Sequence, residues 1–173
     1  LAAAALVYLI SMAQGGMTPL RLVLSGVVLS SAFSALASFL VFRSPDPRAA
    51  QSVLFWMLGS VAGATWDSLW VAALVTVVIA VLMIAFSGWL DALAAGTDVA
   101  RSLGIPDIRV RKALFVGNSV LVGVLVAVSG GIGFVGLVIP HMARLLVGAS
   151  HRSMLPIAAA VGSLFLLWVD VGA

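Results

Sequence analysis

Residues 113–147 read ALFVGNSVLVGVLVAVSGGIGFVGLVIPHMARLLV, and this stretch decides what kind of fold the chain forms. Its part 113–139 carries no charged side chain and is longer than the roughly 20 apolar residues that one membrane-spanning helix needs. The run Ser129-Gly-Gly-Ile-Gly133 interrupts it, because glycines favour turns over helix. We therefore expect a hairpin of two shorter helices, 113–128 and 134–147.

The composition of the whole chain is also that of a membrane protein. Of its 173 residues, 63% are hydrophobic and 9% are charged, whereas a soluble domain is about half apolar and about a quarter charged. So few charged groups cannot cover a water-facing surface, which excludes an ordinary cytosolic enzyme, a disordered chain and a nucleic-acid-binding domain. The sequence has no cysteine, which excludes disulfide scaffolds, thiolate metal sites and cysteine nucleophiles.

Hydropathy divides the chain into membrane-spanning segments. The apolar run 51–64 is only about 21 Å long as a helix, so we expect a re-entrant or interfacial half-helix there. The chain begins and ends in apolar runs, and we expect it to be a piece of a longer permease-like chain. The predicted fold is all-α, a single polytopic membrane helix bundle over 1–173. Its predicted spans are 1–13, 20–42, 68–88, 113–128, 134–147 and 153–169.

Positive charge orients these segments, because cytoplasmic loops of membrane proteins carry an excess of Lys and Arg. With the hairpin, seven cations share one side and two face the other, whereas a single span would give five against four. The seven are Arg21, Arg101, Arg109, Arg111, Lys112, Arg144 and Arg152, and the two are Arg43 and Arg48. The cytoplasmic side then carries 14–21, 89–112 and 148–152, and the outer side carries 43–50 and 65–67.

Small residues recur at four-residue spacing within 20–42, at Gly26, Ser30, Ser34 and Ser38. This spacing places them on one helix face. Small residues let helices approach closely in lipid, so tight packing is one interpretation. The other is the smooth wall of a translocation pathway.

The cytoplasmic segment 89–112 contains two short helices, within 90–104. The first ends at Gly96, Thr97 is the predicted N-cap of the second, and Gly104 suits the position after its end. Helices this short are unstable alone in water. They therefore pack on the membrane or their own bundle, or dock a cytoplasmic partner.

Polar residues near the hairpin allow several roles. Pro140 predicts a kink, and the neighbouring His141 is expected to make a structural hydrogen bond, with a metal or proton role as the alternative. His151 is expected in a solvated loop. Arg144 and Arg152 are expected to contact lipid headgroups or a partner surface.

Motifs that the sequence lacks restrict the chemistry. The sequence has no phosphate-binding loop ending in Lys-Ser/Thr, no Gly-x-Ser-x-Gly elbow and no His-Glu-x-x-His zinc motif. No predicted span contains two carboxylates, which a proton or cation pump would often show. We therefore expect no catalytic, cofactor-binding or metal-binding residue in this chain.

The run Ser129–Arg144, followed by Gly148-Ala-Ser-His-Arg152, closely resembles the signature of one transporter family. It is the FecCD-like family, the permease subunits of type II ABC importers for iron–siderophores, haem and cobalamin. Leu54-Phe-Trp-Met-Leu-Gly-Ser60 with Trp66 is similar to the family's re-entrant segment, and Gly96–Gly104 to its coupling segment. The chain resembles the middle and later part of such a subunit. The motif residues are Gly133, Phe134, Gly136, Pro140, His141 and Arg144.

The resemblance implies a mechanism and partners. Two permease subunits, identical or not, form a central pathway in the bacterial cytoplasmic membrane, and an extracytoplasmic binding protein delivers the substrate. Two cytoplasmic ATPases hold the ATP and Mg and contact the coupling residues, so no cofactor belongs to this chain and no nucleic acid is a partner. The resemblance implies that the helix 20–42, which carries Gly26, Ser30, Ser34 and Ser38, and the segment 51–64 line the pathway, with an inner gate near Thr18 and Pro19. The coupling residues are Leu90, Leu93, Gly96, Thr97, Val99, Arg101, Leu103 and Gly104.

We therefore predict a permease subunit, not an enzyme, that moves an iron–siderophore, or haem or cobalamin, with energy from a partner ATPase. A secondary transporter is the alternative, because broken helices at 51–64 and 129–133 fit a midplane ion site. It would need coordinating groups inside the membrane, and none stands out. A membrane-embedded enzyme is the third reading, and it lacks a catalytic set.

Overall fold

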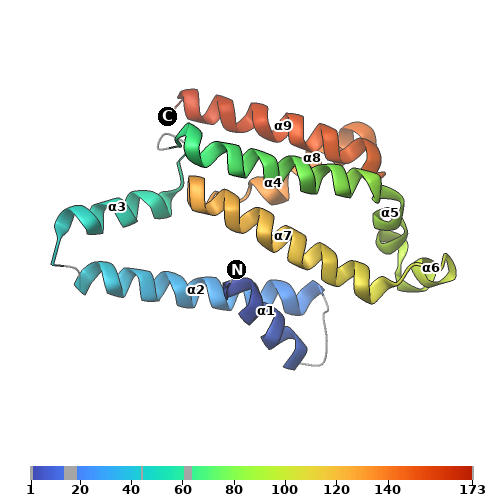
Figure 1. Ribbon diagram of the computed structural model, residues 1–173, viewed down its shortest axis with the longest axis horizontal. Coiled ribbons are helices and arrows are strands. Elements are labelled where there is room, and N and C mark those ends of the chain that lie inside the picture. Colours follow the sequence, from blue (N-terminus) through green and yellow to red (C-terminus); the bar gives the residue numbers. More distant parts are fainter. Residues whose placement is uncertain (1, 14–18, 44, 61–63, 173) are drawn as a thin grey trace. The chain divides into compact units, whose positions relative to one another are not determined.

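The computed structural model describes residues 2–13, 19–43, 45–60 and 64–172. Within these ranges all regular secondary structure is helical (Figure 1), which confirms the predicted all-α class. The chain divides into two compact units, Leu1–Met57 and Leu58–Ala173. The expectation of a single transmembrane domain over 1–173 remains a prediction.

Unit 1 contains α1 (Ala2–Ala13), α2 (Pro19–Arg43) and most of α3 (Pro47–Leu58). The helix α2 packs against α1 and is long and apolar enough to cross a membrane. At its carboxyl end the Arg43 guanidinium lies over the Phe39 ring, 5.8 Å from its centroid, where a cation also complements the helix dipole.

The helix α3 starts earlier than the half-helix expected over 51–64. The carboxylate of Asp46 accepts a hydrogen bond from the backbone N–H of Arg48 at 2.9 Å, as a helix N-cap does. Pro47 is the first helical residue, a position that proline favours. A hydropathy count misses this start because its signals are polar. The re-entrant placement itself stays a prediction.

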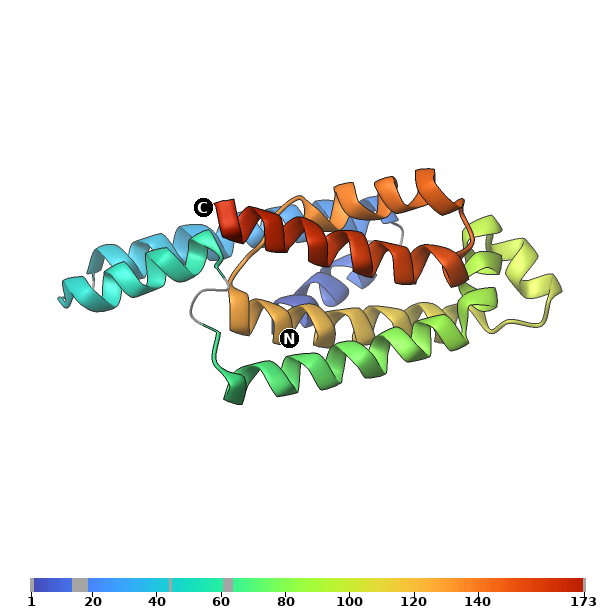
Figure 2. The ribbon, with the colours of Figure 1, turned by 90° about the horizontal axis from the view of Figure 1, so that it is seen from above.

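Unit 2 contains six described helices: α4 (Trp66–Ala85), α5 (Ser87–Ala95), α6 (Thr97–Ser102), α7 (Asp107–Ser129), α8 (Val135–Val147) and α9 (His151–Gly172). Figure 2 shows two adjacent pairs, α4 beside α7 and α8 beside α9. In the second pair Ile139 and Ala143 on α8 and Met154 on α9 are buried, and Ile139 of α8 lies next to Gly162 of α9. The helix α7 begins at Asp107, six positions before the predicted 113, because it continues through charged residues that hydropathy assigns to a loop.

A glycine break separates α7 from α8. Gly130 ends α7 with φ 70°, and Phe134 precedes α8 with φ 64°, a backbone conformation rare outside glycine. The segment before α4 lies against this break, because the Ser60 N–H donates a 2.8 Å hydrogen bond to the Ser129 carbonyl. A Cβ on Gly59 would lie 2.8 Å from the Gly131 carbonyl oxygen, so this approach requires glycine.

The described helices have the dimensions and surface of a membrane protein. Four of them are long and apolar enough to cross a bilayer: α2 from Leu20, α4, α7 and α9. Large apolar side chains of α4 face outward, with exposed fractions of 60% for Val77 and 59% for Val81. Such a surface is stable in lipid but not in water, in agreement with the predicted polytopic membrane bundle.

Candidate functional site

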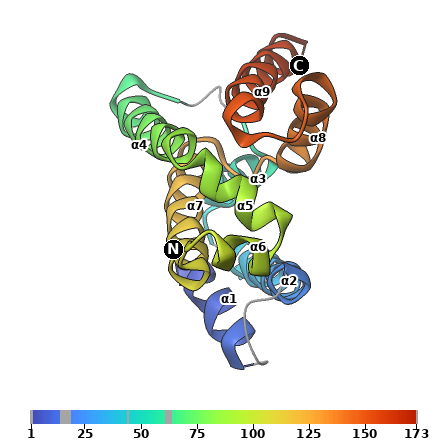
Figure 3. The same cartoon turned by 90° about the vertical axis from the view of Figure 1, so that its right-hand side faces the viewer.

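The candidate site is the end of unit 2 formed by α5 and α6 (Figure 3), which connect α4 to α7. The carboxyl end of α8 and the amino end of α9 lie at this same end (Figure 1). All six Lys and Arg residues of unit 2 belong to these elements or to the first two turns of α7. They are Arg101, Arg109, Arg111, Lys112, Arg144 and Arg152. The opposite end carries Asp67 and Asp170.

The helix α5 follows α4 almost without interruption. It starts at Ser87, before the predicted Leu90. The Phe86 and Trp89 rings pack where α4 meets α5, with their centroids 5.1 Å apart. The helix ends at Gly96, as the sequence predicts, with φ 132°. This value lies outside the range that other residues readily adopt.

Thr97 is not the N-cap of α6, and that prediction is wrong. Gly96 occupies the cap position and Thr97 is the first helical residue. Its hydroxyl instead accepts a 3.2 Å hydrogen bond from the Arg111 guanidinium, which joins α6 to α7. The sequence pattern could not distinguish these two roles, because both place a hydroxyl beside a helix start.

The carboxyl end of α6 is a Schellman motif. The Gly104 N–H donates to the Arg101 carbonyl at 2.9 Å, and the Ile105 N–H donates to the Ala100 carbonyl at 3.0 Å. Gly104 has φ 73°, which is the left-handed position predicted for it. The motif fixes the direction in which the chain turns into α7.

A small apolar core holds α5 and α6 together, and we call this pair of helices the corner. Ala92, Ala100 and Ile105 are buried, and Leu93 packs against them. Leu93 thus faces the interior of the corner rather than a partner. Leu103 is 66% exposed and Val99 is 43% exposed. Among the apolar residues predicted to contact a partner, Leu103 and Val99 are the exposed ones.

Arg101 has an internal partner as well as an exposed side chain. Its guanidinium contacts both carboxylate oxygens of Asp107, at 3.2 and 3.3 Å. The Arg101 side chain is 59% exposed and that of Asp107 is 12% exposed. A forked contact of this kind fixes orientation. It therefore orients α6 relative to α7.

Asp91 makes contacts that the sequence analysis missed. Its carboxylate accepts a 2.9 Å hydrogen bond from the backbone N–H of His151, contacts Nδ1 of the same residue, and accepts a 3.3 Å hydrogen bond from the Ser150 hydroxyl. His151 is the first residue of α9 with a largely buried side chain, so the expectation of a solvated loop is wrong. The only sequence signal is an aspartate in an otherwise apolar short helix.

These contacts stabilise the ionised form of Asp91. The hydrogen bond from the His151 backbone is the largest influence that lowers the pKa of the Asp91 carboxyl below its ordinary value. The contact with the His151 ring lowers it further, against an opposing effect of burial. Asp91 is therefore a carboxylate at neutral pH.

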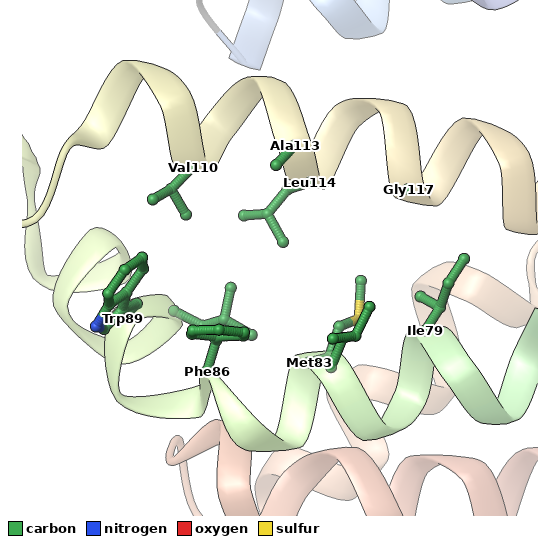
Figure 4. Close-up of a pocket in the computed structure, with 10 residues that line it drawn as sticks. Ile79, Met83, Phe86, Trp89, Val110, Ala113, Leu114 and Gly117 are labelled. Carbon is green, nitrogen blue, oxygen red and sulfur yellow. The ribbon is translucent and has the colours of Figure 1, made fainter.

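An apolar cavity of about 300 Å³ lies between α4, α5 and α7 (Figure 4). Ile79, Met83 and Phe86 face Val110 and Leu114 across it. Its remaining lining residues are Leu82, Trp89, Leu90, Ala113 and Gly117. Leu90 is thus half-buried at the cavity wall. The lining contains no charged side chain and no His or Cys, and no group of three His, Cys, Asp or Glu residues placed to hold a metal ion occurs among the described residues.

The predicted pathway residues lie on α2. Ser30, Ser34 and Ser38 are exposed and Gly26 is half-buried, so unit 1 alone leaves the row open to a pathway or to another helix. Thr18 lies outside the described residues, and Pro19 begins α2. The roles of all these residues remain predictions.

The motif residues lie in the glycine break and along α8. Gly133 and Phe134 belong to the break, and Gly136, Pro140, His141 and Arg144 belong to α8, all exposed except the half-buried Pro140. His141 has no hydrogen-bond partner among the described residues. The structural hydrogen bond expected for it is thus missing there.

Comparison with known proteins identifies relatives that match nearly all of this chain. A family model for the FecCD transport family matches residues 1–173. The chain is 37% identical to the molybdate import system permease protein MolB of Haemophilus influenzae over 96% of this chain and 49% of the relative. It is 36% identical to the cobalamin import system permease protein BtuC of Halobacterium salinarum over 98% of this chain and 46% of the relative.

A third relative is the Fe(3+)-citrate import system permease protein YfmD of Bacillus subtilis, 35% identical over 98% of this chain and 50% of the relative. A solved ABC transporter assigned to the metal-chelate type, in an inward-facing conformation, superposes with a TM-score of 0.86 at 36% identity. The match covers 96% of this chain and 53% of that one. The chain thus spans about half the length of the curated relatives it matches.

Proposed function

Since the chain belongs to the FecCD transport family, we propose that it forms part of the permease subunit of a bacterial ABC importer. The observation that carries this proposal is the family match over the whole chain, together with the TM-score of 0.86 to a solved ABC transporter. In this proposal the subunit is a multi-pass conduit in the cytoplasmic membrane. It is not an enzyme and holds no cofactor, because ATP is hydrolysed in a partner chain.

The end formed by α5 and α6 is the proposed contact for the cytoplasmic ATPase. Three features support it: the exposed Leu103 and Val99, the position of the cations at this end, and a corner held rigid by its own contacts. A rigid corner transmits a displacement, whereas a loose one absorbs it. Gly96 and Gly104 set its turns, and Leu90, Leu93, Thr97 and Arg101 hold its shape.

The pathway is proposed to run along the small residues of α2, Gly26, Ser30, Ser34 and Ser38, with a gate at Thr18 and Pro19. It would be completed by a second permease subunit and supplied by an extracytoplasmic binding protein. The exposed small side chains support this, because a wide substrate needs a wall without specific anchors. Lipid covers the remaining apolar surface.

The substrate is proposed to be a metal-containing solute, with a ferric siderophore tested first. The relatives import molybdate, cobalamin and Fe(3+)-citrate by name, and their identities to this chain differ by only two percentage points. The three solutes share a bound transition metal. Cobalamin, haem and molybdate are therefore the comparison substrates.

A secondary transporter is the competing proposal, and one observation weighs against it. An ion-coupled site needs several coordinating groups at the midplane, whereas the aspartates of unit 2 lie at helix ends or in α5 and α6. Dependence on ATP separates the two classes.

The test is uptake by cells that lack the full-length permease. Radiolabelled ferric siderophore, cobalamin, haem and molybdate are offered in parallel, with the permease restored and with its ATPase active or inactivated. Uptake of one substrate that needs both permease and active ATPase supports the proposal. Uptake that persists with inactive ATPase and collapses with the ion gradient would overturn it in favour of the secondary transporter.

A further inference from the structure

The contact between α5 and α9 joins two elements that are sixty residues apart in the chain. The Asp91 carboxylate lies on α5, and its three partners belong to Ser150 and His151 at the start of α9. The Asp91 side chain is 38% exposed and that of His151 is 18% exposed. Asp91 is the charged side chain of α5, and its described hydrogen bonds all go to Ser150 and His151.

Asp91 occupies the place of a helix cap for α9. The Met154 N–H donates to the Ser150 carbonyl at 3.0 Å, which is the first hydrogen bond of that helix. The N–H of His151 therefore has no acceptor within α9, and the Asp91 carboxylate accepts it. A negative charge also complements the positive end of the helix dipole. A residue of α5 thus completes the first turn of another helix.

The consequence concerns how movement passes through the molecule. The helix α4 runs directly into α5, and α7 follows α6 through the Schellman motif, so both are tied to the corner by the chain itself. The helix α9 is separated from the corner in sequence by α7 and α8. The helix α9 packs on α4 and α5 non-covalently, and Asp91 makes the hydrogen bonds described between α5 and α9.

We propose that Asp91 is a positioning residue that makes α9 move together with α5 when the partner ATPase displaces the corner. This inference rests on the proposed function, because it takes α5 and α6 as the ATPase contact. Without the cap, α5 moves while α9 lags behind. The pathway-forming helices then receive only part of the displacement.

The test measures the distance between α5 and α9 in the full-length permease bound to its ATPase in lipid nanodiscs. Spin labels are attached to cysteines at the exposed positions Ala94 and Ala159. This chain has no native cysteine, and any outside it are first replaced. Distances are recorded without nucleotide and with Mg-ATP plus vanadate. In the unaltered protein we expect one distance in both states.

Four variants decide the outcome. With nucleotide, Asp91→Ala should show a second distance. Its population should be about fivefold that in the unaltered protein, which is the size of effect expected from losing a helix cap. Asp91→Asn keeps an acceptor oxygen and should retain one distance, because Asn caps as well as Asp. Asp170→Ala removes an exposed carboxylate near the other end of α9, away from the ATPase contact, and should match the unaltered protein.

The fourth variant attacks the contact from the other side. His151→Pro removes the N–H donor at a position where proline suits a helix, so it should release α9 as Asp91→Ala does even if that variant does not fold. A single unchanged distance in a folded Asp91→Ala or His151→Pro variant overturns the positioning role. Loss of ATPase co-purification in the unaltered protein overturns the proposed function, and this inference with it.

Discussion

Two irregular segments of unit 2 join its helices in different ways. The corner of α5 and α6 is held by side chains, through Asp91, Arg101 and Arg111 and a small alanine core. The glycine break between α7 and α8 is held by backbone, through the hydrogen bond of Ser60 to Ser129 and the close approach of Gly59 to Gly131. The corner can use charged groups because they reach water. The break lies among apolar helices, where backbone groups must satisfy one another.

The largest expected effect comes from a substitution that disrupts the backbone contact between Gly59 and Gly131. Gly59→Ala places a Cβ 2.8 Å from the Gly131 carbonyl oxygen and keeps a residue at φ 75°, so we expect a loss of about 3 kcal/mol. The measurement is the thermal unfolding temperature of the full-length permease in detergent. Gly88→Ala is the control, because a Cβ there meets nothing within 4 Å and its φ is ordinary for a helix. Equal unfolding temperatures for the two variants would mean that the contact is dispensable.

The second largest effect distinguishes a leucine packed inside the corner from a leucine exposed on its surface. Leu93→Asp puts a carboxylate against the Ala92 and Ala100 core, and we expect a loss of about 2 kcal/mol in stability together with weaker ATPase binding. Leu103→Asp changes a residue that is 66% exposed, so stability should change by less than about 0.5 kcal/mol. Unfolding temperature and ATPase co-purification are measured on both. Normal co-purification with Leu103→Asp would remove this residue from the proposed docking surface.

A smaller effect is expected from replacing Gly104, which lies in the corner, than from replacing Gly59, which lies against the glycine break. Gly104 has nearly the φ of Gly59, 73° against 75°, but a Cβ on it meets nothing within 4 Å. Gly104→Ala should therefore show only the conformational cost of the left-handed region, about 1 kcal/mol. Thermal unfolding of the two alanine variants side by side isolates the cost of the close approach. A loss at Gly104 as large as that at Gly59 would contradict this separation.

The smallest effect concerns the charge on Asp91. Because its contacts lower the pKa of this carboxyl, the stabilisation they give is complete above its ordinary pKa of about 3.9 and is lost as the pH falls through the lowered value. Because the Asp91 side chain is 38% exposed, solvent screening reduces this stabilisation. We expect a difference of about 0.5 kcal/mol between the unaltered protein and Asp91→Asn at about pH 5, which vanishes in acid. Unfolding temperatures at and below about pH 5 provide the measurement. A difference that grows as the pH falls below about 4 would show the opposite linkage.

The sequence was most informative where one signal decides structure. Uncharged runs predict membrane helices from composition alone, and Gly130 and Gly104 mark helix ends because their backbone conformations exclude most other residues. Thr97 shows the limit of local signals, since a cap and a first helical residue look alike. Leu93 and Leu103 are both leucines in a short helical segment, and only packing shows which one faces inward.

Asp91 could not be paired from sequence, because its partners Ser150 and His151 lie beyond two further helices, α7 and α8, along the chain. A single sequence carries no signal for a contact of that separation. The proposed pathway residues on α2 have the same difficulty. Their four-residue spacing describes a helix face, but it does not identify what that face contacts.

The gathering of six cations at one end of unit 2 affects how the chain enters the membrane. Moving one elementary charge across a bilayer changes its energy by about 2.3 kcal/mol for each 100 mV of membrane potential. A bacterial cytoplasm is electrically negative, so inverted insertion would carry Arg101, Arg109 and their neighbours against this field. For the proposed importer, we therefore expect the end formed by α5 and α6 to stay in the cytoplasm when the chain inserts into the membrane.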